Sequence, residues 1–297
     1  MTNVQSPIHS FPTLLPDMSN KYQYEAVSVT LIPGGIAHVQ LNRPKSLNAF
    51  NHATIRDVHA AFRDLSEDKE VLAIVISGAG RMFTAGLDLR DPPFDFSIQS
   101  ADPARAAYGT RKHIEEFQAA FTAIETCHKP VIAAVHSACI GAGMDLITAC
   151  DIRYCSKDAQ FSVKEVDIAL AADVGTLQRL PKVIGSASLV RELCLTGRRR
   201  VRTMYAEEAL SSGLVNKVLD TKEQLLEEAI KTAKLIASKS PVAVYGTKQV
   251  LNYSRDHSVA DGLNYVATWN AAMLNTEDIV KSIEAYMTKK PAQFSKL

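Results

Sequence analysis

Three carboxylates lie within one short stretch of the chain. Asp145 follows the small-residue sequence Gly141-Ala142-Gly143, Glu165 comes twenty residues later, and Asp173 eight residues after that. The neighbours of Glu165 and Asp173 are largely apolar. Because burial disfavours the charged form, it raises the pKa of a carboxyl group and makes it a better base near neutral pH. The three side chains are therefore candidates for acid/base chemistry.

Two loops of small residues are candidates for the complementary groups. One is residues 141–143, and the other lies within the segment 78–89, GAGRMFTAGLDL. If each loop aims one backbone N–H at the same point, the pair holds a carbonyl oxygen and stabilises negative charge on it, best beside a helix N-terminus. With no Gly-x-Ser-x-Gly elbow and no persuasive Cys/His pair, this combination favours enolate-type acid/base chemistry over covalent catalysis.

Each acid also has a structural interpretation. Asp145 complements the dipole of a helix that it opens. Glu165 has Lys164 and Arg179 as possible ion-pair partners, and Asp173 is placed to cap the helix that follows it. Taken singly, the ion pair and the cap are the commoner roles, so the catalytic interpretation depends on the three acids acting together.

The elements that must position these groups indicate an α/β fold. Residues 71–77 and 131–135 are apolar runs typical of strands buried on both faces, and each leads to one of the small-residue loops. Open α/β sheets bind ligands at such strand ends. Residues 27–32 and 36–41 predict a hairpin. Helices are expected at about 51–65, 108–127, 186–195, 203–212, 221–239, 241–254 and 258–288.

The pattern divides the chain into four regions. Residues 1–20 predict a loose arm, 21–200 a strand-rich core with the candidate site, 201–290 a helical region, and 291–297 a tail. The last three residues, Ser295-Lys296-Leu297, are a peroxisomal address, which makes the import receptor an expected partner. The N-terminal residues show no evident mitochondrial transit pattern, so we expect a peroxisomal protein.

Composition excludes several classes of protein. The chain has 297 residues, of which 46% are hydrophobic and 22% charged, with a net charge of +1. It therefore has neither a disordered composition nor the basic footprint of a nucleic-acid-binding protein. No apolar run approaches the roughly 20 residues of a membrane span. The five scattered cysteines predict buried free thiols, and no ligand spacing predicts a metal.

Five segments of the sequence resemble the crotonase (enoyl-CoA hydratase/isomerase) superfamily, and the resemblance covers about residues 25–290. They are LNRPKSLNAF, VLAIVISGAGRMFTAGLDL, KPVIAAVHSACIGAGMDLITACDIRY, VGTLQRLPKVIG and TGRRRVRTMYAEEALSSGLVNKV. Within the superfamily, the chain looks most like the Δ3,5-Δ2,4-dienoyl-CoA isomerases, because acids occupy all three positions Asp145, Glu165 and Asp173.

The resemblance implies a crotonase (ClpP-like) spiral of ββα units, with a C-terminal helical region that builds trimers, commonly paired into hexamers. It also implies a CoA thioester whose carbonyl lies on the backbone amides of Leu87 and Ala142. Relatives often have glycine at position 142, and an alanine there keeps the amide in place if its φ is negative. The residues that would line the substrate path are Ala85, Gly86, Leu87, Asp88, Leu89 and Gly143.

The implied reaction converts a 3,5-dienoyl-CoA to a 2,4-dienoyl-CoA in the β-oxidation of unsaturated fatty acids. A proton leaves C2 and another arrives at C6. Glu165 and Asp173 are the expected shuttle pair, with Asp145 tuning them, and the sequence leaves their order open. No cofactor is expected, since CoA is part of the substrate.

Two other functions stay open at this point. A 2-enoyl-CoA hydratase of this family uses acids at the positions of Asp145 and Glu165 to activate water, but Asp173 favours isomerisation. A non-catalytic, RNA-binding or scaffold protein of this fold would use the basic run Arg198-Arg199-Arg200 with Arg202. The net charge near zero disfavours that reading.

Overall fold

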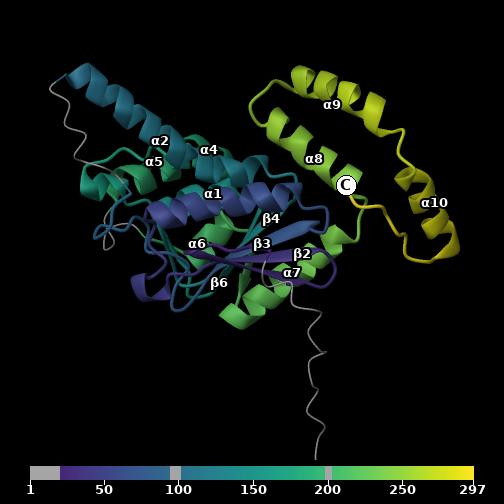
Figure 1. Ribbon diagram of the computed structural model, residues 1–297, viewed down its shortest axis with the longest axis horizontal. Coiled ribbons are helices and arrows are strands. Elements are labelled where there is room, and N and C mark those ends of the chain that lie inside the picture. The colour runs from purple at the N-terminus through teal and green to yellow at the C-terminus, as the bar shows by residue number, and fades with distance from the viewer. Residues whose placement is uncertain (1–20, 94–101, 198–202) are drawn as a thin grey trace, which may run out of the picture.

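A computed structural model describes residues 21–93, 102–197 and 203–297 of the chain (Figure 1). The predicted N-terminal arm, residues 1–20, and the basic run 198–202 lie outside the described residues. The same is true of 94–101.

Two sheets form the body of the protein. The larger has strand order β1-β2-β3-β4-β6-β9 and the smaller β5-β7-β8. β1 and β2 are the predicted antiparallel hairpin, and the other neighbours in the large sheet run parallel. The strands are β1 (Val27–Ile32), β2 (Ile36–Leu41), β3 (Ala73–Gly78), β4 (Val131–Val135), β5 (Ala138–Ile140), β6 (Ile152–Ser156), β7 (Gln160–Ser162), β8 (Met204–Tyr205) and β9 (Lys217–Leu219).

The central strands are buried on both faces, as their apolar runs predict. In β3, Ile74 and Ile76 belong to the larger core on the side of α1 (His52–Glu67) and α2 (Pro103–Thr126). The alternate residues of β3 face a second core built on α7 (Lys222–Ala237). This alternation follows from the two-residue period of a strand. Helices therefore cover both faces of the large sheet (Figure 1).

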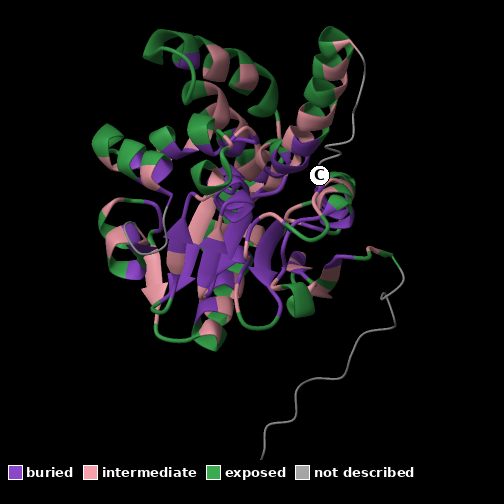
Figure 2. Cartoon of the chain, turned by 90° about the vertical axis from the view of Figure 1, so that its left-hand side faces the viewer, coloured by how far each residue is buried: buried purple, intermediate pink, exposed green. Residues whose placement is uncertain are grey.

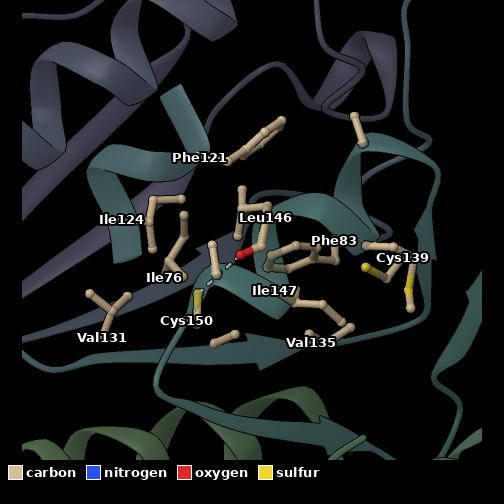
Figure 3. Close-up of a cluster of buried hydrophobic side chains, with 14 of the residues drawn as sticks. Ile76, Phe83, Phe121, Ile124, Val131, Val135, Cys139, Leu146, Ile147 and Cys150 are labelled. Carbon is tan, nitrogen blue, oxygen red and sulfur yellow. Dashed lines mark hydrogen bonds between the residues drawn. The ribbon is translucent and has the colours of Figure 1, made fainter. Parts of the chain in front are cut away.

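The chain moves from the large sheet to the small one before each site element. β4 is followed by β5 and then by α3 (Ala142–Ala149), while β6 is followed by β7 and then by the 3-10 helix η2 (Glu165–Ile168). All eight residues of α3 are buried, as expected for a helix that is apolar on nearly all sides. Figure 3 shows Leu146 and Ile147 of α3 among the core side chains around Phe83. The buried core thus fixes α3, which carries the first acid.

The remaining helices connect these units or follow them. They are η1 (Pro44–Ser46), α4 (Thr176–Val183), α5 (Ala187–Thr196), α6 (Ala206–Ser211), α8 (Pro241–Ser254), α9 (Val259–Met273) and α10 (Asp278–Thr288). α8, α9 and α10 extend away from the sheets, and much of their surface is exposed (Figures 1 and 2). Within the described residues, no helix is both long and apolar enough to cross a membrane.

Four predicted elements differ clearly from the structure. The helix expected over 203–212 begins only at Ala206, because β8 takes up Met204 and Tyr205. α2 begins at Pro103 and not near residue 108, because Asp102 caps it by accepting a hydrogen bond from the Ala104 amide at 2.9 Å. The helix predicted over 258–288 is two helices, since the Thr276 hydroxyl accepts from the Asp278 amide at 3.2 Å and starts a new one. The core also continues past residue 200, where β9 pairs with β6 and α7 covers the sheet.

Candidate active site

The first strand-end loop is braced by Asn48, a buried residue of the LNRPKSLNAF segment. Its Nδ2 donates to the carbonyl oxygens of Ala79 at 2.8 Å, Met82 at 3.0 Å and Phe83 at 3.1 Å. Because Asn48 is 1% exposed, water does not compete for these bonds. They fix the path of the chain from β3 toward Leu87.

Leu87 lies where this loop runs beside Phe50. The Phe50 amide donates to the Gly86 carbonyl at 2.7 Å, and the Asp88 amide donates to the Phe50 carbonyl at 2.9 Å. Since the residues on either side of Leu87 make both bonds, its own N–H points away from Phe50. Among the described residues, no acceptor is bonded to the Leu87 amide. That amide is available to a ligand.

The second loop enters α3 through Gly141, whose φ of 53° lies in the left-handed region. The Gly141 amide donates to the Ser162 carbonyl at 2.9 Å, and the Met144 amide donates to the Gly141 carbonyl at 2.7 Å. Ala142 occupies the first helical position, where an amide has no acceptor within its helix. Ala142 has no positive φ, so the condition set for an alanine at this position is met.

The backbones of the two loops are in contact. A Cβ atom at Gly86 would lie 2.8 Å from the carbonyl oxygen of Ile140 and 3.6 Å from Cα of Gly141. A Cβ atom at Gly143 would lie 2.5 Å from Cγ2 of Thr84. Glycine is required for this close approach. The structure therefore brings the loops of Leu87 and Ala142 together.

Asp145 is fully buried in the first turn of α3. Its Oδ1 accepts a hydrogen bond from the Thr176 amide at 2.5 Å. Its Oδ2 and the Thr176 hydroxyl, both buried, have no hydrogen-bond partner among the described residues. Burial, and next the negative charge of Glu165, raises the pKa of Asp145 to about 7. Asp145 can therefore exchange a proton near neutral pH.

Glu165 begins η2 and lies against the second loop. Its Oε1 is 3.4 Å from the position that a Cβ atom would take at Gly141, and its Oε2 accepts from the Lys164 amide at 2.7 Å. The ion pairs considered for it do not form: the Lys164 ammonium binds Asp167 at 2.8 Å, and Arg179 binds a different carboxylate. Burial raises the pKa of Glu165, so its environment is that of a candidate base.

Asp173 precedes α4 but does not cap it. The helix begins at Thr176 with Gly175 at the N-cap and no side-chain cap, so the capping interpretation is wrong. The Asp173 carbonyl accepts from Nε2 of Gln118 at 2.6 Å, which leaves the carboxyl free of this bond. Burial raises the pKa of Asp173, whose negative charge contributes in turn to the raised pKa of Glu165.

The three acids are thus electrostatically coupled, with Glu165 interacting with both Asp145 and Asp173. Neighbouring buried carboxyl groups resist simultaneous ionisation, so the charge on one raises the pKa of the next. A group of this kind beside two available amides can exchange protons with a ligand whose carbonyl oxygen those amides hold.

Asp88 and Leu89, both predicted to line the substrate path, lie in different environments. Asp88 accepts hydrogen bonds from Nη1 of Arg43 at 3.0 Å and from the amides of Arg90 at 3.1 Å and Asp91 at 3.3 Å. Burial opposes them, but these bonds hold the pKa of Asp88 below its ordinary value. The Asp88 carboxylate therefore stabilises the turn at residues 88–91 and its contact with Arg43. Leu89 is 67% exposed and lies at the protein surface.

All five cysteines are buried and free, as predicted. In the part of the chain that the structure describes, no group of three His, Cys, Asp or Glu side chains is arranged to hold a metal ion. Two residues beside the acids had no sequence signal of their own. Gln118 contacts Asp173 from 55 positions earlier, and the backbone amide of Thr176 donates to Asp145.

Comparison with known proteins agrees with this geometry. The family model described as Enoyl-CoA hydratase/isomerase matches residues 32–296. A rat (Rattus norvegicus) protein named Delta(3,5)-Delta(2,4)-dienoyl-CoA isomerase, mitochondrial, is 53% identical over 95% of this chain and 86% of its own length. The protein of the same name from Arabidopsis thaliana, designated peroxisomal, is 48% identical over 88% of this chain and 93% of its own length. A probable enoyl-CoA hydratase of Rhizobium meliloti is 32% identical over 88% of this chain and 95% of its own length.

Solved structures confirm the expected crotonase fold. An enoyl-CoA hydratase from Bacillus anthracis superposes with a TM-score of 0.80 at 26% identity, covering 91% of this chain and 99% of that one. An enoyl-CoA hydratase/isomerase from Mycobacterium paratuberculosis gives a TM-score of 0.80 at 29% identity, covering 92% and 99%. The chain belongs to the enoyl-CoA hydratase/isomerase family.

Proposed function

We propose that this protein is a Δ3,5-Δ2,4-dienoyl-CoA isomerase. The observation that carries the proposal is the third acid, Asp173, which is coupled to Glu165 and does not serve as a helix cap. A reaction that takes a proton from one carbon and returns one to a distant carbon uses two separate acid/base groups. The names of the rat and Arabidopsis relatives support the same activity.

In the proposed mechanism, the amides of Leu87 and Ala142 hold the thioester oxygen. Negative charge develops on that oxygen when a proton leaves C2, and two preoriented N–H donors stabilise it most in the transition state. Ala142 adds the field of the N-terminus of α3. These donors support the proposal because neither has an acceptor among the described residues.

Protons and charge balance as follows. Ionised Glu165 takes the proton from C2, the electron pair spreads over the thioester and the diene, and protonated Asp173 delivers a proton to C6. The 3,5-diene becomes a 2,4-diene, and a later proton exchange restores the two carboxyl groups. Glu165 is assigned to C2 because its Oε1 lies close to Gly141, beside the Ala142 amide that would hold the thioester oxygen on the neighbouring carbon C1. The raised pKa of Asp145, about 7, favours its neutral form and so limits the negative charge near Glu165.

Hydration of a 2-enoyl-CoA is the second candidate, favoured by the hydratase names among the relatives. The two functions are separated by incubating the protein with a 3,5-dienoyl-CoA and, separately, with crotonyl-CoA. We expect rapid appearance of the conjugated 2,4-diene absorbance and much slower loss of the enoyl band. Rapid hydration without diene formation would contradict the proposal.

The role of Asp173 is tested by Asp173→Asn, which removes a proton carrier and changes the shape little. We expect kcat for diene isomerisation to fall by about 100-fold or more, in the range of a lost general acid, with KM nearly unchanged. Asp167→Asn is the matched control, because Asp167 lies on η2 but is paired with Lys164. An unchanged kcat in Asp173→Asn would remove Asp173 from the mechanism.

We further propose that the protein acts in peroxisomes as a homotrimer or hexamer and needs no cofactor. Ser295, Lys296 and Leu297 are exposed, which suits a sequence read by an import receptor. A groove of about 550 Å³ with mostly apolar lining, between α8, α9 and α10, offers surface for subunit contacts. The tests are location of a reporter with and without the last three residues, light scattering of the purified protein, and activity after dialysis against a chelator.

A further inference from the structure

Arg179 folds back over the residues that carry the third acid. Residues 173–176, called here the acid segment, follow η2 and end at Thr176, the first residue of α4. Nη1 of Arg179 donates to the Val174 carbonyl at 3.5 Å. A Cβ atom at Gly175 would lie 1.9 Å from that same Nη1. The guanidinium therefore occupies the space that glycine leaves, and the two residues pack as a unit.

A carboxylate on another helix holds this guanidinium in place. Oε2 of Glu125, in the last turn of α2, accepts from Nε of Arg179 at 3.2 Å and from Nη2 at 2.8 Å. Nη2 also donates to the hydroxyl of Thr122 at 3.3 Å. The side chains of Arg179 and Glu125 are only 12% and 14% exposed, so solvent screens the pair weakly. Paired donors on one acceptor also fix the plane of the guanidinium.

Glu125 is joined in turn to the C-terminal helices. Its Oε1 accepts from Nη1 of Arg255, the C-cap residue of α8, and its backbone carbonyl accepts from Nδ2 of Asn252 at 3.1 Å. Burial acts to raise the pKa of Glu125, but the guanidinium groups of Arg179 and Arg255 hold it below its ordinary value. An ionised carboxylate therefore connects the acid segment, α2 and α8.

The other ends of the acid segment are held as well. Gln118 of α2 binds the carbonyl of Asp173, and Asp145 of α3 binds the amide of Thr176. Arg179 supplies the contact between these two points. The three heavy atoms nearest to the Cβ position of Gly175 all belong to Arg179.

We propose that Arg179 is a positioning residue, held by Glu125, that sets the backbone of the acid segment and thereby the place of the Asp173 carboxyl relative to the substrate. The proposal rests on the isomerase function, in which Asp173 exchanges a proton with the substrate. Displacement of a reacting group by about 1 Å can cost on the order of 100-fold in rate. Arg179 acts through Asp173.

Kinetic measurement of Arg179→Lys and Glu125→Gln tests the proposal. Lysine keeps the charge but loses the planar fork that reaches Val174 and Glu125 together. We expect kcat for diene isomerisation to fall by about 10- to 100-fold, with KM changing by less than about threefold, because the thioester is held by other loops. The kcat of the double variant should be about equal to that of the more impaired single variant, since both substitutions break the same unit.

Lys182→Met is the matched control, because Lys182 lies on the same helix and its ammonium pairs with Asp256 near the end of α8. Its kcat should equal that of the parent. Loss of kcat in the control to the same extent as in Arg179→Lys, or an unchanged kcat in Arg179→Lys, would overturn the proposal.

Amide hydrogen exchange supplies a readout that does not depend on activity. A peptide covering residues 170–180 should exchange faster in Arg179→Lys than in the parent, and at the parent rate in Lys182→Met. Unchanged exchange in Arg179→Lys would refute the positioning role even if the parent isomerises dienes. Failure of the parent to isomerise a 3,5-dienoyl-CoA would instead refute the proposed function, while faster exchange in Arg179→Lys would still support the positioning of the segment.

Discussion

The pKa of Asp145 makes the stability of the protein depend on pH in a way that one substitution removes. The folded value of about 7 exceeds the ordinary value of 3.8, and each tenfold change in a protonation equilibrium is worth about 1.4 kcal/mol, so ionising the buried carboxyl costs the native state about 4 kcal/mol. This group therefore contributes its full stability below pH 3.8, and the contribution is lost as the pH rises through 7.

Asp145→Asn has a side chain of similar shape and no charge to lose. Its amide oxygen can still accept from the Thr176 amide, and its new Nδ2 can donate to the Thr176 hydroxyl, which has no partner among the described residues. We expect the free energy of unfolding of the variant, relative to the parent, to rise by about 3 kcal/mol between pH 5 and pH 8. For a chain of this size, that corresponds to a relative gain in Tm of roughly 6 °C.

The measurement is thermal unfolding of both proteins in matched buffers from pH 5 to pH 8. Asp68→Asn is the control, because hydrogen bonds from Lys21 and Tyr22 outweigh burial and hold the pKa of Asp68 below its ordinary value. Its contribution is present above pH 3.8 and lost only at lower pH, so its Tm difference from the parent should stay constant over this range. A Tm difference for Asp145→Asn that does not change with pH would refute the argument from burial.

Three further predictions concern the scaffold, each measured as a free energy of unfolding in urea. Ser137→Gly should stabilise the protein by about 0.5 kcal/mol, because relief of a φ of 53° outweighs the added freedom of the unfolded chain; a loss would mean that the serine is not strained. Gly143→Ala should cost about 1–3 kcal/mol, because its Cβ would meet Thr84 at 2.5 Å. Lys248→Met should cost about 1–3 kcal/mol, because the buried ammonium donates to the carbonyl oxygens of Ile124 at 3.4 Å and Lys129 at 3.1 Å, and these acceptors lose their donor; no change in either variant would contradict these contacts.

The sequence predicted best what depends on local pattern. The strand at 131–135 has the predicted bounds, because five consecutive apolar residues suit a strand covered on both faces. The break in the helix predicted over 258–288 was missed, since residues 274–277 contain neither glycine nor proline, and the new helix starts from the Thr276 hydroxyl. The spacing and apolar neighbours of the three acids made them candidates, and the resemblance supplied their expected roles.

What depends on long-range contacts was beyond the sequence. That Asp173 is not a cap follows only from where α4 begins, and that Glu165 lacks a cation follows only from the other partners of Lys164 and Arg179. The Arg179–Glu125 pair joins residues 54 positions apart on different helices, and neither local periodicity nor spacing predicts such a pair.

The free N–H of Leu87 has an evolutionary consequence. A backbone amide survives every side-chain replacement except proline, which has no N–H to offer. Many amino acids at position 87 would therefore keep the proposed oxyanion donor. A Leu87→Ala substitution would leave this N–H in place, so alanine scanning would not detect it. Selection for the Leu87 N–H would instead act on the residues that shape the loop, such as Asn48 and Gly86.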